Sequence, residues 1–147
     1  MNTRTLVIFE RDETLLDVIA EMLQSCCEDM RVLKTTDQDE AWRMIQEYRP
    51  CIVITEAVPV LDVLNPKSFQ AGDPGFLLMK NIRESQNQDI NSCWLVLLMS
   101  RMLEDMPDEV RDLIGERAYL YGKPFSFPEA KETLTILLSV LFRRIPA

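Results

Sequence analysis

The feature that most constrains the fold is a regular alternation of short apolar runs with segments of helical periodicity. Five short segments are expected to form strands, at residues 6–9, 31–34, 51–55, 94–99 and 118–121, and the apolar runs at 6–9, 51–55 and 94–99 are expected to be buried. Each is followed by a segment with apolar residues at helical spacing, at residues 13–27, 39–48, 76–84, 104–114 and 126–144. Because right-handed helical crossovers connect parallel strands, this alternation predicts a five-stranded parallel sheet with helices on both faces.

One interruption breaks the pattern, between the third strand and the third helix. Residues at about 57–74 carry three prolines and Gly72, and we expect them to form an inserted loop within one domain that spans residues 1–147. The apolar content of this loop suggests a lid or a docking surface, with local packing as the alternative. The apolar residues concerned are Val60, Leu61, Val63, Leu64 and Phe69.

The composition excludes several classes of function. The formal net charge of −8 disfavours nucleic acids and anionic membrane surfaces as partners. The chain contains no histidine, so neither a Ser-His-Asp nor a Cys-His catalyst can form. The glycine-rich motifs that hold nucleotide phosphates are also absent. We therefore expect a protein that is not an enzyme.

The distribution of apolar residues and cysteines indicates a cytoplasmic protein. No apolar run approaches the roughly 18 residues of a membrane-spanning helix, and the N-terminal run is too short for a signal peptide. The cysteines form no Cys-x-x-Cys motif, and we expect free thiols that are buried where they fall in strands. They are Cys26, Cys27, Cys51 and Cys93.

Polar residues follow several of the predicted strands. In parallel sheets of this kind the functional crevice lies at the carboxyl ends of the strands, so these residues are the candidates for a functional site. They are Glu10, Arg11 and Asp12 after the first strand, Glu56 after the third, Ser100 after the fourth and Lys123 after the fifth.

These strand ends resemble the receiver domain of two-component response regulators, over about residues 5–143. The segment Pro50-Cys-Ile-Val-Ile-Thr-Glu56 has the spacing of the family's third strand, which ends in the phosphoacceptor Asp. Met99-Ser100 matches the end of the fourth strand, and Lys123-Pro124-Phe125 matches the motif after the fifth. The resemblance implies a flavodoxin-like (βα)5 doubly wound fold and a role in phosphorelay signal transduction. A histidine kinase or an output domain is the implied partner.

The resemblance also implies a role for each candidate residue. In the family, an acidic cluster holds Mg²⁺ beside the phosphoacceptor, a lysine adds positive charge, and a hydroxyl contacts the phosphoryl oxygens. Glu10, Arg11 and Asp12 correspond to the acidic cluster and Glu56 to the phosphoacceptor. Ser100 and Lys123 correspond to the site lining. The aromatic switch residue is Tyr119 by its motif, or Leu120 by counting back from Lys123.

The sequence departs from the family at the centre of this site. Glu56 replaces an aspartate, and its extra methylene moves the carboxylate by roughly 1 Å. Arg11 replaces a metal-binding acid, and its positive charge should repel Mg²⁺. The intervals from Glu56 to Gly75 and from Tyr119 to Lys123 are also longer than the family's.

These departures lead to one specific hypothesis. Arg11 occupies the place of the metal and pairs with Glu56, while Lys123 contacts Glu56 from the other side. The site is then locked in one state, and Glu56 reaching toward Ser100 mimics the phosphorylated form. The competing interpretations are that Glu56 is merely an acid at a degenerate site, that Arg11 points into solvent and that Lys123 is an ordinary surface lysine.

For the same reason we expect no cofactor. Mg²⁺ is expected only if the receiver is active, and Glu10 and Asp12 are then the remaining candidates for metal ligands.

The last predicted helix, at residues 126–144, is apolar most of the way round. Such a helix is normally buried on both sides, so we expect its outer face to be covered by a second subunit in a homodimer or by a partner domain. The alternative is a wide core-facing stripe with a few exposed apolar residues.

The sequence thus predicts a pseudo-receiver that acts in signalling through protein–protein interaction. The first alternative is an active receiver that takes phosphate from a histidine kinase on Glu56, or on Asp62 or Asp73 in the loop. The second is an unrelated flavodoxin-like ligand-binding domain or enzyme.

Overall fold

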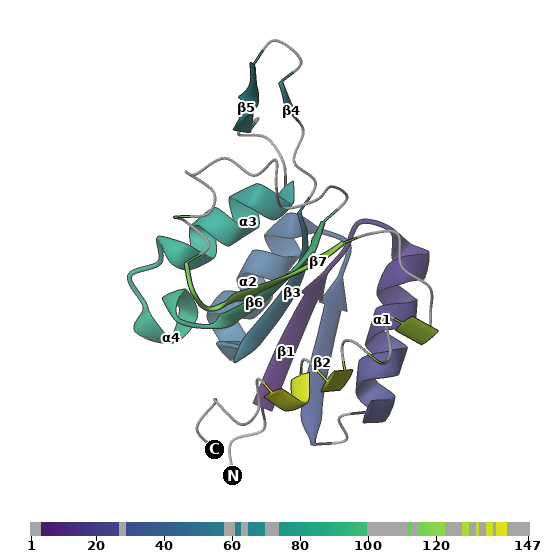
Figure 1. The fold of residues 1–147 in the computed structure, drawn as a ribbon. Helices are drawn as coiled ribbons and strands as arrows, with labels where there is room; N and C mark the ends of the chain where they lie inside the picture. The colour runs from purple at the N-terminus through teal and green to yellow at the C-terminus, as the bar shows by residue number, and fades with distance from the viewer. Residues whose placement is uncertain are drawn as a thin grey trace.

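The computed structural model describes residues 4–26, 29–57, 61–62, 65–69, 74–99, 112, 115–122, 128–129, 132, 135–136 and 138–140. Its central element is a five-stranded sheet with the strand order β2-β1-β3-β6-β7 (Figure 1). All four pairings between neighbouring strands are parallel. This is the strand order of flavodoxin-like doubly wound sheets, so the predicted fold class is confirmed. The strands are β1 (Arg4–Phe9), β2 (Met30–Thr35), β3 (Ile52–Ala57), β6 (Trp94–Met99) and β7 (Ala118–Gly122).

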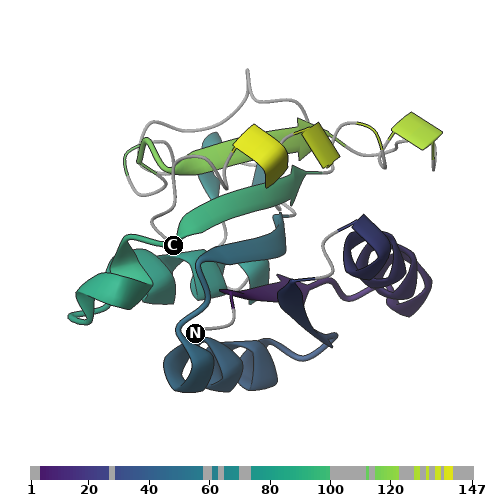
Figure 2. The same cartoon turned by 90° about the horizontal axis from the view of Figure 1, so that it is seen from below.

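Helices cover both faces of the sheet (Figures 1 and 2). Helix α1 (Glu13–Cys26) lies on one face. The other face carries α2 (Gln38–Tyr48), α3 (Pro74–Arg83) and α4 (Gln88–Asn91). Because successive strand residues point to opposite faces, the apolar strands supply a core to each side. The bounds of these five strands and of α1, α2 and α3 agree with the predicted elements to within a few residues at each end, whereas α4 was not predicted.

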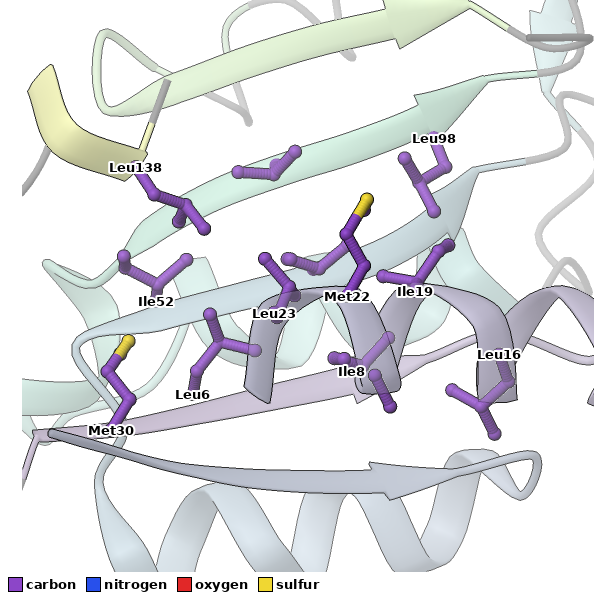
Figure 3. Close-up of a cluster of buried hydrophobic side chains, with 13 residues drawn as sticks. Leu6, Ile8, Leu16, Ile19, Met22, Leu23, Met30, Ile52, Leu98 and Leu138 are labelled. Atoms are coloured by element: carbon purple, nitrogen blue, oxygen red, sulfur yellow. The ribbon is translucent and has the colours of Figure 1, made fainter. Parts of the chain in front are cut away.

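The core on the α1 face is formed by aliphatic side chains and methionines (Figure 3). Fully burying a side chain of this kind contributes about 1.5–3 kcal/mol, so this layer is a major source of stability. Its members are Leu6, Ile8, Leu16, Ile19, Ala20, Met22, Leu23, Met30, Ile52, Ile54, Val96, Leu98 and Leu138.

The core on the opposite face is built from the alternate strand residues and from the inner sides of three helices. It contains one cysteine, Cys93, which is buried just before β6. Its members are Val7, Phe9, Ala41, Ile45, Val53, Leu78, Met79, Ile82, Ile90, Cys93, Leu95 and Leu97.

The C-terminal region is helical at residues 128–129, 132, 135–136 and 138–140, inside the predicted helix 126–144. Leu138 is buried in the α1-face core, whereas Ile136 is 57% exposed. One side of this segment therefore packs on the sheet, and Ile136 lies on another side. The predicted helix 104–114 lies outside the described residues, except for Asp112, which is helical.

The inserted segment lies at the predicted place in the chain, and part of it forms a hairpin that was not predicted. Ala57 ends β3 and Pro74 begins α3, and between them β4 (Leu61–Asp62) pairs antiparallel with β5 (Asn65–Phe69). This hairpin projects beyond the carboxyl ends of the sheet strands (Figure 1). The β4–β5 hairpin was not predicted because prolines argue against strands. Pro66 is nevertheless tolerated in β5, since the strands of a two-stranded sheet are edge strands.

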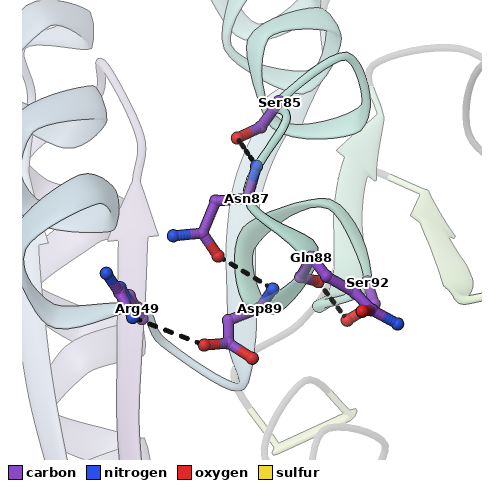
Figure 4. Close-up of polar contacts among 6 residues, drawn as sticks. All are labelled: Arg49, Ser85, Asn87, Gln88, Asp89 and Ser92. Carbon is purple, nitrogen blue, oxygen red and sulfur yellow. Dashed lines mark hydrogen bonds and ion pairs between the residues drawn. The ribbon is translucent and has the colours of Figure 1, made fainter.

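Helix α4 was missed because four residues are too few to show a helical period. Its signal is local: the Asn87 side chain accepts a hydrogen bond from the backbone N–H of Asp89 at 2.9 Å (Figure 4). The Asp89 carboxylate also lies 3.5 Å from the Arg49 guanidinium. Asparagine at this position is a favoured helix N-cap.

Candidate functional site

The site is centred on the carboxyl ends of β1 and β3, which are neighbours in the sheet. Glu10 follows β1 directly, and its backbone N–H donates at 3.3 Å to the carbonyl of Thr35, the last residue of β2. Glu10 is only 1% exposed. Its carboxylate oxygen Oε1 accepts from the backbone N–H of Asp12 at 3.4 Å. The buried acid therefore turns back onto its own chain.

Asp12 is exposed and directly precedes α1. Its Oδ1 accepts from the backbone N–H of Leu15 at 3.1 Å, and its carbonyl accepts from the N–H of Leu16 at 2.9 Å. Asp12 is thus the N-cap of α1, and a negative charge is favourable at that end of a helix.

Glu56 lies within β3, where it pairs with Leu98 of β6, and β3 continues to Ala57. It is therefore one residue inside the strand, although the sequence placed it just after. Glu56 is 3% exposed. Because β3 extends through Glu56, the Glu56 carboxylate lies beside the carboxyl end of β1.

Arg11 forms the contact that the sequence predicted. Its Nε donates to Oε1 of Glu56, and the two side chains form an ion pair. The side chain of Arg11 is 47% exposed and that of Glu56 is 4% exposed. The alternative that Arg11 points away into solvent is wrong. An isolated buried carboxylate would be strongly unfavourable, so this guanidinium compensates a charge that the fold removes from water.

The acids at this edge do not fit the Mg²⁺ that receiver domains hold. Glu10 accepts from a backbone N–H, Asp12 caps a helix, and Glu56 is paired with Arg11. Across the described part of the chain, no group of three or more His, Cys, Asp or Glu side chains is placed to hold a metal ion.

The remaining candidates are placed only in part. Ser100, Lys123 and Asp73 lie outside the described residues, so the predicted contact between Lys123 and Glu56 stays a prediction. Asp62 is placed in β4, with its backbone alone described.

Tyr119 is not brought to this edge of the sheet. Its ring packs 5.9 Å from that of Trp94, on the α1 face. Trp94 is the first residue of β6, at the amino end, whereas Glu56 pairs with Leu98 near the carboxyl end. Which of Tyr119 and Leu120 is the switch residue stays a prediction. Leu120, the candidate found by counting, pairs with Leu97.

Sequence analysis missed a second polar cluster, which is centred on Arg83 at the carboxyl end of α3. The Arg83 guanidinium donates to the carbonyls of Asn91 and Cys93 through Nη1 and to that of Arg117 through Nη2, each at 2.8 Å. Burial lowers the pKa of Arg83. The cluster ties α3 to the start of β6 and β7. No sequence motif announces it, because the acceptors are backbone carbonyls.

The described cysteine side chains, those of Cys51 and Cys93, are free thiols as predicted; Cys93 is buried, whereas the predicted burial of Cys51 is only partial. Burial raises the pKa of both, and that of Cys93 reaches about 12. No helix in the described part of the chain has the length and apolar character needed to cross a membrane.

No protein-family model and no curated protein sequence matches the chain. Solved structures do match it. The chemotaxis response regulator CheY4 of Vibrio cholerae superposes with a TM-score of 0.66 at 17% identity, covering 95% of this chain and 98% of that one.

The signal receiver domain of a DNA-binding response regulator from Colwellia psychrerythraea 34H gives 0.65 at 16% identity, covering 92% and 98%. A response regulator from Thermotoga maritima gives 0.62 at 15% identity, covering 93% and 98%. At these identities the comparison establishes the fold over nearly the whole chain.

Proposed function

We propose that this chain, which has the receiver-domain fold, is a pseudo-receiver: a signalling module that works by protein–protein interaction without a phosphorylation cycle. The observation that carries the proposal is the ion pair between Arg11 and Glu56. In this pair, the acid that corresponds to the phosphoacceptor is bound by a cation of the chain itself.

The chemistry of phosphoryl transfer explains why this pair matters. In-line attack requires a carboxylate oxygen that is free to approach the donor, and a metal ion that neutralises the phosphoryl oxygens. Here a guanidinium neutralises the Glu56 carboxylate through Oε1, which weakens it as a nucleophile, and the neighbouring acids accept from backbone N–H groups. The fixed positive charge of Arg11 can also take the place of the cation that balances the charge of an activated site. This supports a signalling surface that stays in one state.

The proposed partners are proteins: a histidine kinase, an output domain or a second copy of this chain. Ile136, at 57% exposure, supports an interface on the C-terminal helix. The sequence of the predicted helix at residues 126–144 is apolar most of the way round, and contiguous apolar surface of this kind marks interaction sites. The free thiols of Cys51 and Cys93 support a cytoplasmic location.

An active receiver is the competing function. It would accept phosphate on Glu56, or on Asp62 or Asp73 of the inserted segment. The burial of Glu56 at the carboxyl end of the parallel sheet, where receivers hold their acceptor, is the observation that favours it.

Incubation with acetyl phosphate and Mg²⁺, followed by intact-mass measurement, separates the two functions. We expect no added phosphoryl group on the wild-type chain, while an active receiver in the same reaction becomes labelled. A stoichiometric phosphoryl adduct would overturn the proposal. The variant Glu56→Gln then locates the adduct: loss of labelling assigns it to Glu56, and persistence assigns it to another acid.

A further inference from the structure

We infer that Arg11 is a built-in counter-ion that holds the carboxyl end of β1 to that of β3, so that the site keeps one electrostatic state at any concentration of divalent cation. This inference rests on the proposed function and adds a regulatory property to it. A module of this kind is insensitive to Mg²⁺, and its surface is set when it folds.

The first step of the argument is the asymmetry of the pair. The Glu56 side chain is 4% exposed, so water cannot stabilise its charge, whereas Arg11 is 47% exposed. Arg11 can therefore reach Glu56 from solvent and remain partly hydrated. Loss of the guanidinium would leave a buried, uncompensated carboxylate, and that is far more costly than loss of an exposed charge.

A second ion pair in the same fold provides an internal reference. Lys34 pairs with Asp17 at 2.7 Å, and the Lys34 side chain is also 47% exposed. Its partner Asp17, however, is 56% exposed. The two cations are equally accessible, and the two carboxylates differ strongly in burial. An exposed pair such as Lys34–Asp17 contributes little.

The third step concerns what could replace Arg11. Glu10 and Asp12 flank it in sequence, and both are acidic. With the guanidinium present, these acids are engaged by the backbone, and no group of them within the described residues is placed for a metal. Without it, the edge would hold three carboxylates and excess negative charge. Oxygen-rich, negatively charged edges attract hard divalent cations.

These steps define an experiment on urea unfolding of the full chain, measured with EDTA and with millimolar MgCl2 at matched ionic strength. We expect Arg11→Ala to lower the folding equilibrium constant by about tenfold or more. The control Lys34→Ala should lower it by less than about fivefold. We expect MgCl2 to leave the wild-type midpoint unchanged and to raise that of Arg11→Ala.

A double-mutant cycle keeps the inference testable if Arg11→Ala folds poorly. Glu56→Gln removes the charge that Arg11 compensates, so Arg11→Ala/Glu56→Gln should be more stable than Arg11→Ala alone. Arg11→Lys retains the cation and should stay insensitive to Mg²⁺.

Two results would overturn the inference. One is a wild-type midpoint that rises with MgCl2 and not with NaCl of equal ionic strength. The other is an Arg11→Ala variant no less stable than Lys34→Ala. Neither result touches the proposed function, which fails only if the chain becomes phosphorylated.

Discussion

Arg83→Lys should destabilise the fold although it preserves the charge. The Arg83 guanidinium donates to the carbonyls of Asn91, Cys93 and Arg117, each at 2.8 Å. The lysine side chain is one atom shorter and lacks this planar fork, so its ammonium falls short of the position of Nη1, which serves the carbonyls of Asn91 and Cys93. The carbonyl of Arg117 also accepts from the N–H of Leu95 at 3.0 Å and tolerates the loss. The main cost falls on the carbonyls of Asn91 and Cys93.

The expected magnitude follows from the number and burial of the lost bonds. A hydrogen bond from a charged donor contributes about 1.5–3 kcal/mol, and the half-buried position of Arg83 reduces that value through solvation. We expect a loss of about 2 kcal/mol for Arg83→Lys, or a decrease of roughly 6 °C in Tm for a domain of this size. Urea denaturation gives the free energy of unfolding directly.

Arg49→Lys is the matched control for this prediction. Arg49 is exposed and contacts Asp89 at 3.5 Å, so its replacement should change stability by less than about 0.5 kcal/mol. If Arg83→Lys is equally mild, the carbonyl cluster does not hold α3 to the sheet and the reasoning fails.

Three further predictions concern the C-terminal helix and the buried thiol. Leu138→Ala should lower the free energy of unfolding by about 3 kcal/mol, because Leu138 is 1% exposed in the α1-face core; a loss below about 1 kcal/mol would mean that the helix is not docked there. Ile136→Glu should leave stability nearly unchanged and weaken self-association in sedimentation velocity, and an unaltered monomer–dimer equilibrium would exclude this interface. Burial raises the pKa of Cys93 from 9.0 to about 12, so the native thiol should resist iodoacetamide under mildly alkaline conditions that label the unfolded chain. Rapid labelling of native Cys93 would contradict the burial. By linkage, the contribution of this thiol to stability is complete below about pH 9 and is lost as the pH rises toward 12, because the unfolded chain releases its proton first.

The sheet was predictable because its central strands β1, β3 and β6 contain continuous apolar runs. Buried parallel strands need apolar residues on both faces, and a segment such as Ile52–Ala57 shows this without any tertiary information. The same logic placed Glu10, Arg11 and Glu56 at one edge, since parallel strands end together. The contact between Arg11 and Glu56 was predicted from the resemblance to receiver domains, in which these positions correspond to the metal-binding cluster and the phosphoacceptor.

Other features depend on contacts that a sequence pattern does not carry. The β4–β5 hairpin has one strand of two residues, and Pro66 obscures the other. The position of Tyr119 depends on which face of β7 it occupies and on its packing with Trp94. Neither the motif nor counting back from Lys123 could determine this face and this packing. Arg83 gave no signal because its partners are carbonyls from three separate segments.

A crystal structure of the chain soaked in MnCl2, with anomalous data collected near the manganese edge, tests the central claim most directly. The account predicts no anomalous peak between Glu10 and Glu56, with the Arg11 guanidinium still on the Glu56 carboxylate. A manganese ion bound at that edge, with Arg11 rotated into solvent, would contradict it.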